Sequence, residues 1–289
     1  MRVVKTIKQL RRAVKAIRLK GRKIGFVPTM GYFHAGHLSL MAKAKRECGA
    51  CVVSIYVNPK QFAPHEDLGR YPRDLRRDST LAEKENVDIL FIPSDNVVYP
   101  KSFLTYIDVE KISRTLCGQY RPGHFRGVAT VVAKLLNMAT PDVMYLGQKD
   151  AQQAAVLKTM AADLDFPLTV RVMPTVREKD GLAMSSRNVY LTARERAQAP
   201  VLYRSLNLAR ARIQKGERSA AGIIRFIRKN IARHTEGKIQ YVACVDADTL
   251  GPLKILKGRV LIALSVFFGS TRLIDNVIIP VKKPREVQN

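Results

Sequence analysis

Residues 23–40, KIGFVPTMGYFHAGHLSL, contain the transition that decides the fold. An apolar run rich in β-forming residues leads to Pro28, and an apolar pattern with helical spacing begins around His37. A strand that passes through a glycine-bearing turn into a helix is the repeating unit of parallel α/β folds. The turn also carries His34, three residues before His37, so this segment bears on function as well.

The same alternation continues through the first 175 residues. Strands that are apolar throughout and separated by helices indicate a parallel sheet with both faces covered. We therefore predict a doubly wound α/β domain over residues 1–175, with ligands bound beyond the carboxyl ends of its strands. The expected strands are 23–28, 51–57, 87–93, 143–146 and 168–173, and the expected helices are 37–48, 71–86, 125–139 and 150–163.

The pattern changes in the last third of the chain. Two helical stretches are followed by three β-rich runs, the last two of which are joined at Gly269-Ser270. Helices followed by antiparallel strands indicate an α+β unit, so we predict a smaller second domain over residues 176–289. Its expected helices are 193–215 and 219–234, and its expected strands are 239–245, 259–268 and 271–279.

The composition favours a folded, strongly basic protein. Of the 289 residues, 46% are hydrophobic, which is enough for a sizeable core. Fifty Lys and Arg residues against 24 acidic ones give a net charge of +26, so nucleic acid is the first partner to consider. The basic residues are spread along the whole chain and form no single arm, which disfavours that partner. A basic proteome or a surface tuned for solubility explains the charge as well.

Neither a membrane nor an oxidising compartment is indicated. No stretch approaches the roughly 18 apolar residues of a membrane span. The basic, amphipathic start (1–21) predicts a first helix and not a signal peptide, because it lacks an unbroken apolar core and a small-residue cleavage site. Four cysteines are too few for a disulfide framework, so we expect a cytoplasmic protein in which Cys48 and Cys51 are structural.

The two histidines have three possible roles. A zinc pair on a helix is normally spaced i, i+4 and needs a third ligand, whereas His34 and His37 are spaced i, i+3 at a turn. Chance placement, with core or surface roles, is the second possibility. The third is a grip on phosphate, since a helix N-terminus offers free N–H groups and Gly31 and Gly36 allow close approach. Imidazoles there can also donate hydrogen bonds as charge develops in a transition state.

Three more polar segments follow expected strands, so the fold would bring them to the same edge of the sheet. They supply hydrogen-bond donors and a cation but almost no acid, base or nucleophile. This set of functional groups fits nucleotidyl transfer, in which positioning and charge neutralisation do most of the catalysis. The segments are VNPKQF (57–62) with Asn58 and Gln61, YLGQKDAQQ (145–153) with Gly147, Lys149, a helix-capping Asp150 and Gln153, and REKDGLAMSSRN (177–188) with Gly181, Ser185, Ser186 and Arg187.

Taken together, these motifs closely resemble the pantoate–β-alanine ligase family over essentially the whole chain. PTMGYFHAGHLSL, VNPKQF, RPGHFRGVATVVAKLLN, LGQKDAQQ, GLAMSSRNVYL and TRLIDNVII carry the resemblance. HAGH alone is also similar to the HxGH signature of other nucleotidyltransferases and of class I aminoacyl-tRNA synthetases. The resemblance implies a Rossmann-like domain with a smaller C-terminal lid, usually as a homodimer. It also implies that pantoate's carboxylate attacks Mg-ATP to form pantoyl adenylate, which the amine of β-alanine then converts into pantothenate and AMP.

The resemblance also implies roles for individual residues. His37 holds the position usually given the proton-donor role, Lys149 contacts the ATP phosphates and Asp150 the ribose. Catalysis is carried by His34, His37, Lys149, Ser185, Ser186 and Arg187, and pantoate is held by Gln61 and Gln153. The ATP site comprises Pro28, Thr29, Met30, Gly31, Tyr32, Phe33, His34, Ala35, Gly36, His37, Gly147, Gln148, Lys149, Asp150, Val176, Met184, Ser185, Ser186 and Arg187.

The magnesium expected with ATP has no clear protein ligand set. The family's acids in this region have been linked to Mg²⁺, but Arg77 stands where an acid is common and leaves Asp78 alone. We therefore expect the ion to arrive on the ATP phosphates, as is usual for this hard cation. Two further interpretations remain: another HxGH nucleotidyltransferase or a truncated aminoacyl-tRNA synthetase, and an RNA-binding protein on a degraded form of the fold.

Overall fold

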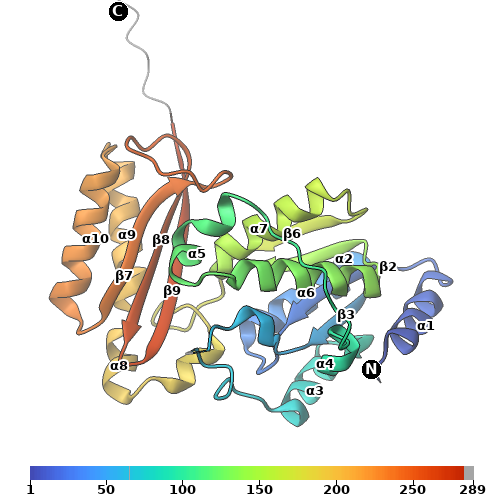
Figure 1. The fold of residues 1–289 in the computed structure, drawn as a ribbon. Coiled ribbons are helices and arrows are strands. Elements are labelled where there is room, and N and C mark those ends of the chain that lie inside the picture. The colour runs from blue at the N-terminus through green and yellow to red at the C-terminus, as the bar shows by residue number, and fades with distance from the viewer. Residues whose placement is uncertain (65, 283–289) are drawn as a thin grey trace, which may run out of the picture. The chain divides into compact units, whose positions relative to one another are not determined.

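The computed structural model describes residues 1–64 and 66–282 and divides the chain into two compact units (Figure 1). Unit 1 comprises residues 1–114 and 118–176. Unit 2 comprises residues 115–117 and the chain from Arg177 onward. Each unit has its own sheet, so each is described by itself.

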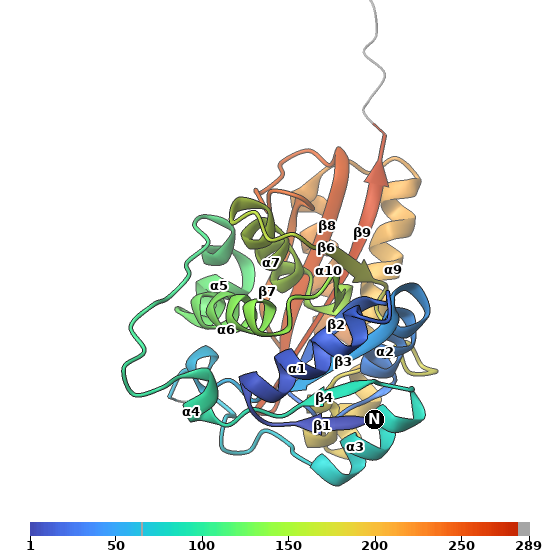
Figure 2. The ribbon, with the colours of Figure 1, turned by 90° about the vertical axis from the view of Figure 1, so that its right-hand side faces the viewer.

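Unit 1 contains the predicted parallel sheet, with strand order β1-β4-β3-β2-β5-β6 and every recorded pair parallel (Figure 2). The central strands are almost fully buried, which explains why they are apolar at successive positions. The strands are β1 (Arg2–Val4), β2 (Lys23–Thr29), β3 (Gly49–Ile55), β4 (Ile89–Phe91), β5 (Val143–Gly147) and β6 (Thr169–Met173).

Helices cover both faces of this sheet. One face carries α1 (Ile7–Arg18), α6 (His124–Ala139) and α7 (Ala151–Asp163), and the other carries α2 (Ala35–Cys48) and α3 (Leu75–Lys84) (Figure 2). This is the arrangement that right-handed crossovers require, because the chain moves one way along the sheet through α2 and α3 and the other way through α1, α6 and α7. Shorter helices are α4 (Asp95–Val98) and α5 (Leu116–Tyr120), with 3₁₀ turns η1 (Pro59–Gln61), η2 (Ile112–Arg114) and η3 (Gln148–Asp150).

The direction of strand succession reverses between β2 and β5, which are neighbours in the sheet. Their recorded pairing covers only Gly25 with Val143 and Phe26 with Met144, near the start of each strand. Beyond these pairs the two carboxyl ends lead into loops that turn to opposite faces. Ligands of doubly wound folds bind at such a switch point. The loops after β2 and β5 are therefore the expected place for a site.

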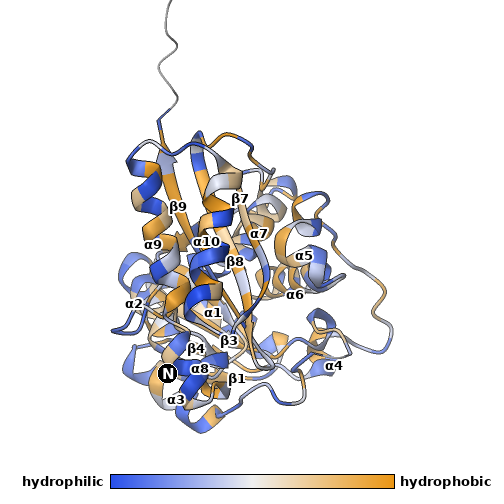
Figure 3. Ribbon diagram, turned by 90° about the vertical axis from the view of Figure 1, so that its left-hand side faces the viewer, coloured by the Kyte–Doolittle hydropathy of each residue, from blue (hydrophilic) through white to orange (hydrophobic). Residues whose placement is uncertain are grey.

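Unit 2 has a three-stranded antiparallel sheet in the order β7-β8-β9, with two long helices packed on it. Ile223, Ile227 and Ile231 recur at helical spacing on α10 and are fully buried in a core shared with the sheet. The apolar character of β8 and the mixed character of α10 are visible in Figure 3. The elements are α8 (Ala193–Gln198), α9 (Val201–Gln214), α10 (Ala220–His234), β7 (Lys238–Asp246), β8 (Gly258–Phe268), β9 (Thr271–Val281) and the 3₁₀ turn η4 (Ser186–Tyr190).

Several predicted boundaries were wrong, each for a local reason. The single helix expected over 193–215 is two helices, because Pro200 lacks the N–H that a continuous helix needs and starts α9 instead. The helix expected over 71–86 begins only at Leu75, where the Asp74 carboxylate accepts from Arg77 N and caps it. The start of the chain is not helical throughout, since β1 precedes α1 and pairs with β4.

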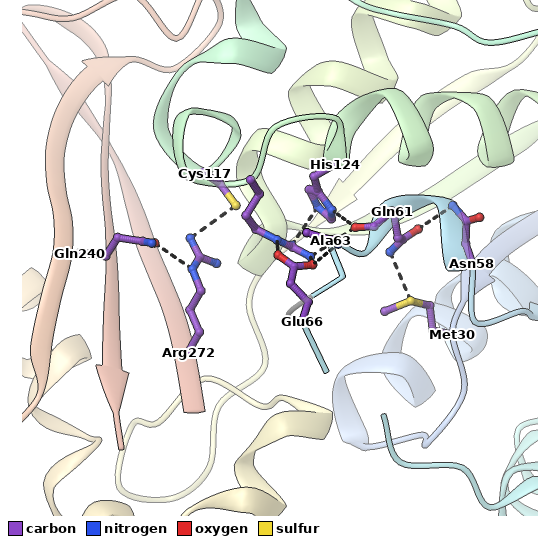
Figure 4. Close-up of polar contacts among 10 residues, drawn as sticks. Met30, Asn58, Gln61, Ala63, Glu66, Cys117, His124, Gln240 and Arg272 are labelled. Carbon is purple, nitrogen blue, oxygen red and sulfur yellow. Dashed lines mark hydrogen bonds and ion pairs between the residues drawn. The ribbon is translucent and has the colours of Figure 1, made fainter. Parts of the chain in front are cut away.

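All four cysteines are buried thiols. Burial raises the pKa of Cys244 to about 12, which leaves this thiol protonated and unreactive near neutral pH. In unit 2, Cys117 Sγ lies 3.4 Å from Arg272 Nη2, and Arg272 Nε also donates to Gln240 Oε1 at 2.8 Å (Figure 4).

Among the helices that the structure describes, none combines the length and the apolar character needed to cross a membrane.

Candidate active site

The turn after β2 is held by a buried carboxylate from α3. Gly31 and Tyr32 have φ values of 84° and 53°, in the left-handed region that favours glycine. Asp78 accepts hydrogen bonds from Tyr32 N and Phe33 N, both at 2.7 Å, and is only 1% exposed. A Cβ on Gly31 would lie 3.0 Å from Asp78 Oδ2, so glycine and carboxylate fit each other closely. The main chain of the turn is therefore held by contacts with the protein itself.

The histidine turn is the N-terminus of α2. Helix α2 begins at Ala35, two residues before the predicted start, and His34 is its N-cap. His34 Nδ1 accepts from Gly36 N at 3.1 Å, and His37 Nδ1 accepts from His34 N at 3.3 Å. A Cβ on Gly36 would lie 2.8 Å from His34 Cε1. With the His34 ring in this orientation, a side chain at residue 36 would clash with it, and the close ligand approach predicted for Gly36 stays a prediction.

These contacts determine which nitrogen of each imidazole can donate. In a neutral imidazole one nitrogen accepts and the other carries the proton. Because each Nδ1 accepts a backbone N–H, the proton of each neutral ring lies on Nε2. The ring centroids are 4.1 Å apart, so the two Nε2–H groups belong to one small region at the helix N-terminus. This is an arrangement suited to donating hydrogen bonds to an anion.

Burial lowers the pKa of His37 well below its usual value, and His34 and Lys149 lower it further by charge repulsion. His37 is therefore a neutral N–H donor near neutral pH. The influence of Lys149 also shows that the loop after β5 reaches the loop after β2, as the sheet topology predicts. The structure thus brings His34, His37 and Lys149 together from two segments far apart in the sequence.

The loop after β5 differs from prediction at one residue. Asp150 occupies the N-cap position of α7, but its side chain makes no capping hydrogen bond, so the predicted cap is wrong. Its Oδ1 lies instead 3.6 Å from Lys149 Nζ. A Cβ on Gly147 would meet no atom within 4 Å, so the packing of the chain does not itself require glycine there. Gln148, like its neighbours, is half-buried.

Gln61 lies in the 3₁₀ turn η1, directly after β3, and is 8% exposed (Figure 4). Its Oε1 accepts from Asn58 Nδ2 at 3.1 Å, and its Nε2 lies 3.2 Å from Met30 Sδ. Asn58 is held in turn by Tyr99, whose hydroxyl donates to Asn58 Oδ1 at 3.0 Å. These contacts join the end of β3 to the turn after β2. Gln153, on α7, is half-buried, and its amide has no recorded hydrogen bond within the described chain.

Helix α6 supports this turn through a glycine that sequence reasoning did not single out. Asn58 Nδ2 also donates to Gly127 O at 3.1 Å. A Cβ on Gly127 would lie 2.3 Å from Lys60 O and 2.8 Å from Gln61 Cα. Only glycine lets the turn pack this closely on the helix. A glycine within an otherwise apolar helical stretch was the signal that could have indicated the contact.

The remaining predicted residues of the β2 turn have mainly supporting roles. Phe33 is fully buried in the core between α2 and the sheet. Thr29 is buried as well, donating to Ser54 O at 2.6 Å while its Oγ1 accepts from Gly31 N at 3.2 Å. Pro28, Met30 and Tyr32 are half-buried, and Ala35 is exposed.

The residues present do not fit a protein-held magnesium ion. Both oxygens of Asp78 already accept backbone N–H groups, and burial raises the pKa of this carboxyl despite them. In the described parts of the chain, no three His, Cys, Asp or Glu side chains are grouped so that they could hold a metal. Mg²⁺ prefers several oxygen ligands in octahedral geometry, which this site does not offer.

The serine-rich segment belongs to unit 2. Ser185 caps η4 by accepting from Arg187 N at 3.2 Å, and Ser186 is buried. Met184 and Arg187 are half-buried, as is Val176, the last residue of unit 1.

A buried ion pair anchors the chain just before this segment. Arg177 and Asp275 form a bidentate pair with distances of 2.7 and 2.9 Å. The Arg177 guanidinium also lies 3.5 Å from the centroid of the Tyr203 ring and donates to Gly181 O at 3.1 Å. Asp275 comes from the RLIDN stretch on β9, so two of the motifs quoted from the sequence meet in this pair.

Comparison with known proteins shows the family of the chain. The model of the family described as pantoate-beta-alanine ligase matches residues 2–278. A pantothenate synthetase of Caldicellulosiruptor saccharolyticus is 52% identical over 281 residues, covering 97% of this chain and 100% of the relative. One of Moorella thermoacetica is also 52% identical, covering 97% and 99% of the two chains.

Two solved structures extend the comparison. The crystal structure of pantothenate synthetase from Thermus thermophilus superposes with a TM-score of 0.91 at 45% identity, covering 96% of this chain and 99% of that one. The pantoate-beta-alanine ligase of Francisella tularensis, complexed with β-γ ATP and β-alanine, gives 0.78 at 36% identity, covering 96% and 97%. The matched residues include the turn after β2 with His34 and His37, the 3₁₀ turn η1 with Gln61, and the loop after β5 with Lys149. The chain belongs to the pantoate–β-alanine ligase family.

Proposed function

We propose that the switch-point edge of unit 1 binds ATP beside pantoate and catalyses the condensation of pantoate with β-alanine. The pantoate carboxylate attacks the α-phosphorus of ATP, and pyrophosphate leaves as pantoyl adenylate forms. The amine of β-alanine then attacks the acyl carbon, releasing AMP and giving pantothenate. Adenylation is needed because a free carboxylate would have to expel oxide, whereas the acyl adenylate expels AMP.

The observation that carries this proposal is the pair of Nε2–H donors at the start of α2. Both rings are oriented by backbone N–H groups on Nδ1. They act with the helix N-terminus and with the nearby Lys149 cation on the negative charge of the transferring phosphoryl group. His37 acts as a neutral hydrogen-bond donor in this role. Its lowered pKa disfavours the imidazolium that direct proton donation would require.

Other residues complete the two substrate pockets. Gln61 and Gln153 hold the hydroxyl and carboxylate oxygens of pantoate through their amides. Gly147 leaves room for the nucleotide, since no atom of the chain would meet a side chain there. Gln148, Lys149 and Asp150 contact the nucleotide, and Val176 faces the adenine through its backbone. Met184, Ser185, Ser186 and Arg187 supply hydroxyl, backbone and guanidinium donors to the triphosphate.

We also infer how magnesium reaches the enzyme, where the enzyme acts and in what oligomeric state. Magnesium is carried by the ATP phosphates, because Asp78 is committed to the turn. The enzyme acts in the cytoplasm as a homodimer, as is usual in the family. Nucleic acid is not its substrate. Its basic surface instead favours the approach of its anionic substrates.

An assay of AMP release with each substrate omitted in turn tests this function. AMP should form with pantoate and β-alanine together, and its steady release should stop when either is absent. His37→Ala should lower the rate of adenylation by about 10²–10³-fold, as the loss of an oxyanion-type donor does. AMP released equally well without pantoate would contradict the assignment, and normal turnover of His37→Ala would contradict the role of the imidazole.

A further inference from the structure

Two side chains beyond the proposed substrate contacts meet at one main-chain carbonyl, that of Gln61, and a third side chain, Glu66, holds one of them (Figure 4). His124 Nδ1 lies 2.8 Å from Gln61 O, and Arg121 Nη2 lies 3.4 Å from the same oxygen. Arg121 Nη1 lies 3.1 Å from His124 Nε2. Arg121 also forms a bidentate pair with Glu66, with both distances 2.5 Å. We refer to Glu66, Arg121 and His124 as the carbonyl clamp.

The partners of His124 determine its protonation. An arginine side chain can only donate, so His124 Nε2 must accept from Arg121 and carries no proton. The proton of the neutral ring is then on Nδ1, from which it is donated to Gln61 O. Arg121 therefore fixes the tautomer that holds the carbonyl, much as a second ring contact fixes metal-bound histidines.

Glu66 neutralises the charge of Arg121 and also contacts the main chain that follows Gln61, at Ala63. The two side chains are only 14% and 15% exposed, so their pair is better shielded than a surface ion pair. Glu66 Oε2 also accepts from Ala63 N at 3.2 Å. The clamp thus connects the start of α6, where His124 lies, with both Gln61 and Ala63 after β3.

The contacts of the Gln61 side chain are not enough to hold it alone. Among the residues that the structure describes, its Nε2 meets only the sulfur of Met30, which is a weak acceptor. Its Oε1 has one strong partner, Asn58. The orientation of the amide therefore depends on the position of the main chain from which it projects.

We propose that the carbonyl clamp is a positioning device for the pantoate pocket, which fixes the Gln61 main chain so that its amide meets pantoate in one orientation. This inference rests on the proposed role of Gln61 in pantoate binding. The clamp residues do not touch the reacting atoms, and they act on the reaction through Gln61. Their loss raises the KM for pantoate and leaves the KM for ATP unchanged.

Two substitutions of His124 separate the donor atom from the bulk of the ring. His124→Asn places an amide N–H near the position of Nδ1 and keeps the bond to Gln61 O. His124→Gln places its amide near the position of Nε2 and loses that bond. Leaving this buried carbonyl with only the long contact to Arg121 predicts a rise of about 5–100-fold in the KM for pantoate for His124→Gln. The His124→Asn variant should stay within about threefold of the parent enzyme, and both should keep the parent KM for ATP.

Gln61→Ala and Glu66→Gln complete the experiment. Gln61→Ala must itself raise the KM for pantoate; if it does not, the proposed role of Gln61 is wrong. If Gln61→Ala raises it but His124→Gln and His124→Asn both behave like the parent, the clamp is refuted while the substrate pocket stands. Equal increases for both His124 variants, or an equal increase for ATP, would also refute it.

Thermal unfolding of each variant confirms that it is folded. Should His124→Gln fail to fold, Glu66→Gln takes its place, because it removes the charge on which Arg121 depends and keeps the ring. An unchanged KM for pantoate in Glu66→Gln would then overturn the clamp.

Discussion

Substitution of Gly127 by alanine tests how closely the 3₁₀ turn η1, which carries Gln61, packs against α6. In α6 the change removes an unfavourable helix residue, so propensity alone predicts stabilisation by about 1 kcal/mol. The new Cβ, however, would lie 2.3 Å from Lys60 O and 2.8 Å from Gln61 Cα. Ordinary contacts start near 3.4 Å, so the turn must retreat by about 1 Å.

A displacement of that size in a substrate-positioning group costs about 10²-fold in rate. We therefore expect Gly127→Ala to lower kcat/KM for pantoate by about 10²-fold, with the KM for ATP unchanged. Overpacking should also lower the free energy of unfolding by about 1–3 kcal/mol. Steady-state kinetics with each substrate varied in turn and urea denaturation measure the two effects.

Gly69→Ala provides the matched control, since a Cβ there would meet no atom within 4 Å. That variant should keep the kinetics and stability of the parent. A Gly127→Ala enzyme that is more stable than the parent and has unchanged kcat/KM for pantoate would refute the reasoning.

Three further predictions concern the supports of the site. Asp78→Asn loses one charge-assisted bond to the histidine turn, so the free energy of unfolding should fall by about 1.5–3 kcal/mol in urea denaturation, with a higher KM for ATP. Asp275→Asn leaves the Arg177 charge buried without its partner, which should cost about 3–5 kcal/mol, seen as a lower Tm; an unchanged Tm would contradict it. Because the pKa of His37 is lowered in the fold, the unfolded chain binds a proton that the folded chain does not, and stability should fall as pH drops below about 6.5. Urea denaturation at several pH values should show this loss at up to about 1.4 kcal/mol per pH unit, and His37→Asn should reduce it.

The sheet of unit 1 was largely predictable, because its buried strands are apolar at successive positions and alternate with helices. The direction of the chain then implied that the loops after β2 and β5 would meet, and the effect of Lys149 on His37 agrees with that. β1 was missed since three residues give no periodicity to read. The break at Pro200 was visible in the sequence and was overlooked.

The supports of the site could not be predicted, because they depend on contacts between segments far apart in the chain. Asp78 lies more than 40 residues from the turn that it holds. The sequence of its own helix does not indicate that both of its carboxylate oxygens accept main-chain N–H groups of that turn. Gly127 is explained only by the main chain of Lys60 and Gln61, which comes from a different element. The sequence places His124 in the RPGHFRGV motif, but the tautomer of its ring follows only from the position of Arg121 in the fold.

If the donors at the start of α2 promote adenylation of the pantoate carboxylate, the enzyme forms pyrophosphate before β-alanine takes part. The most direct test is exchange of labelled pyrophosphate into ATP in the absence of β-alanine. We predict exchange that requires pantoate, proceeds without β-alanine and is slowed by about 10²–10³-fold in His37→Ala. Exchange that proceeds without pantoate, or at the parent rate in His37→Ala, would contradict the account.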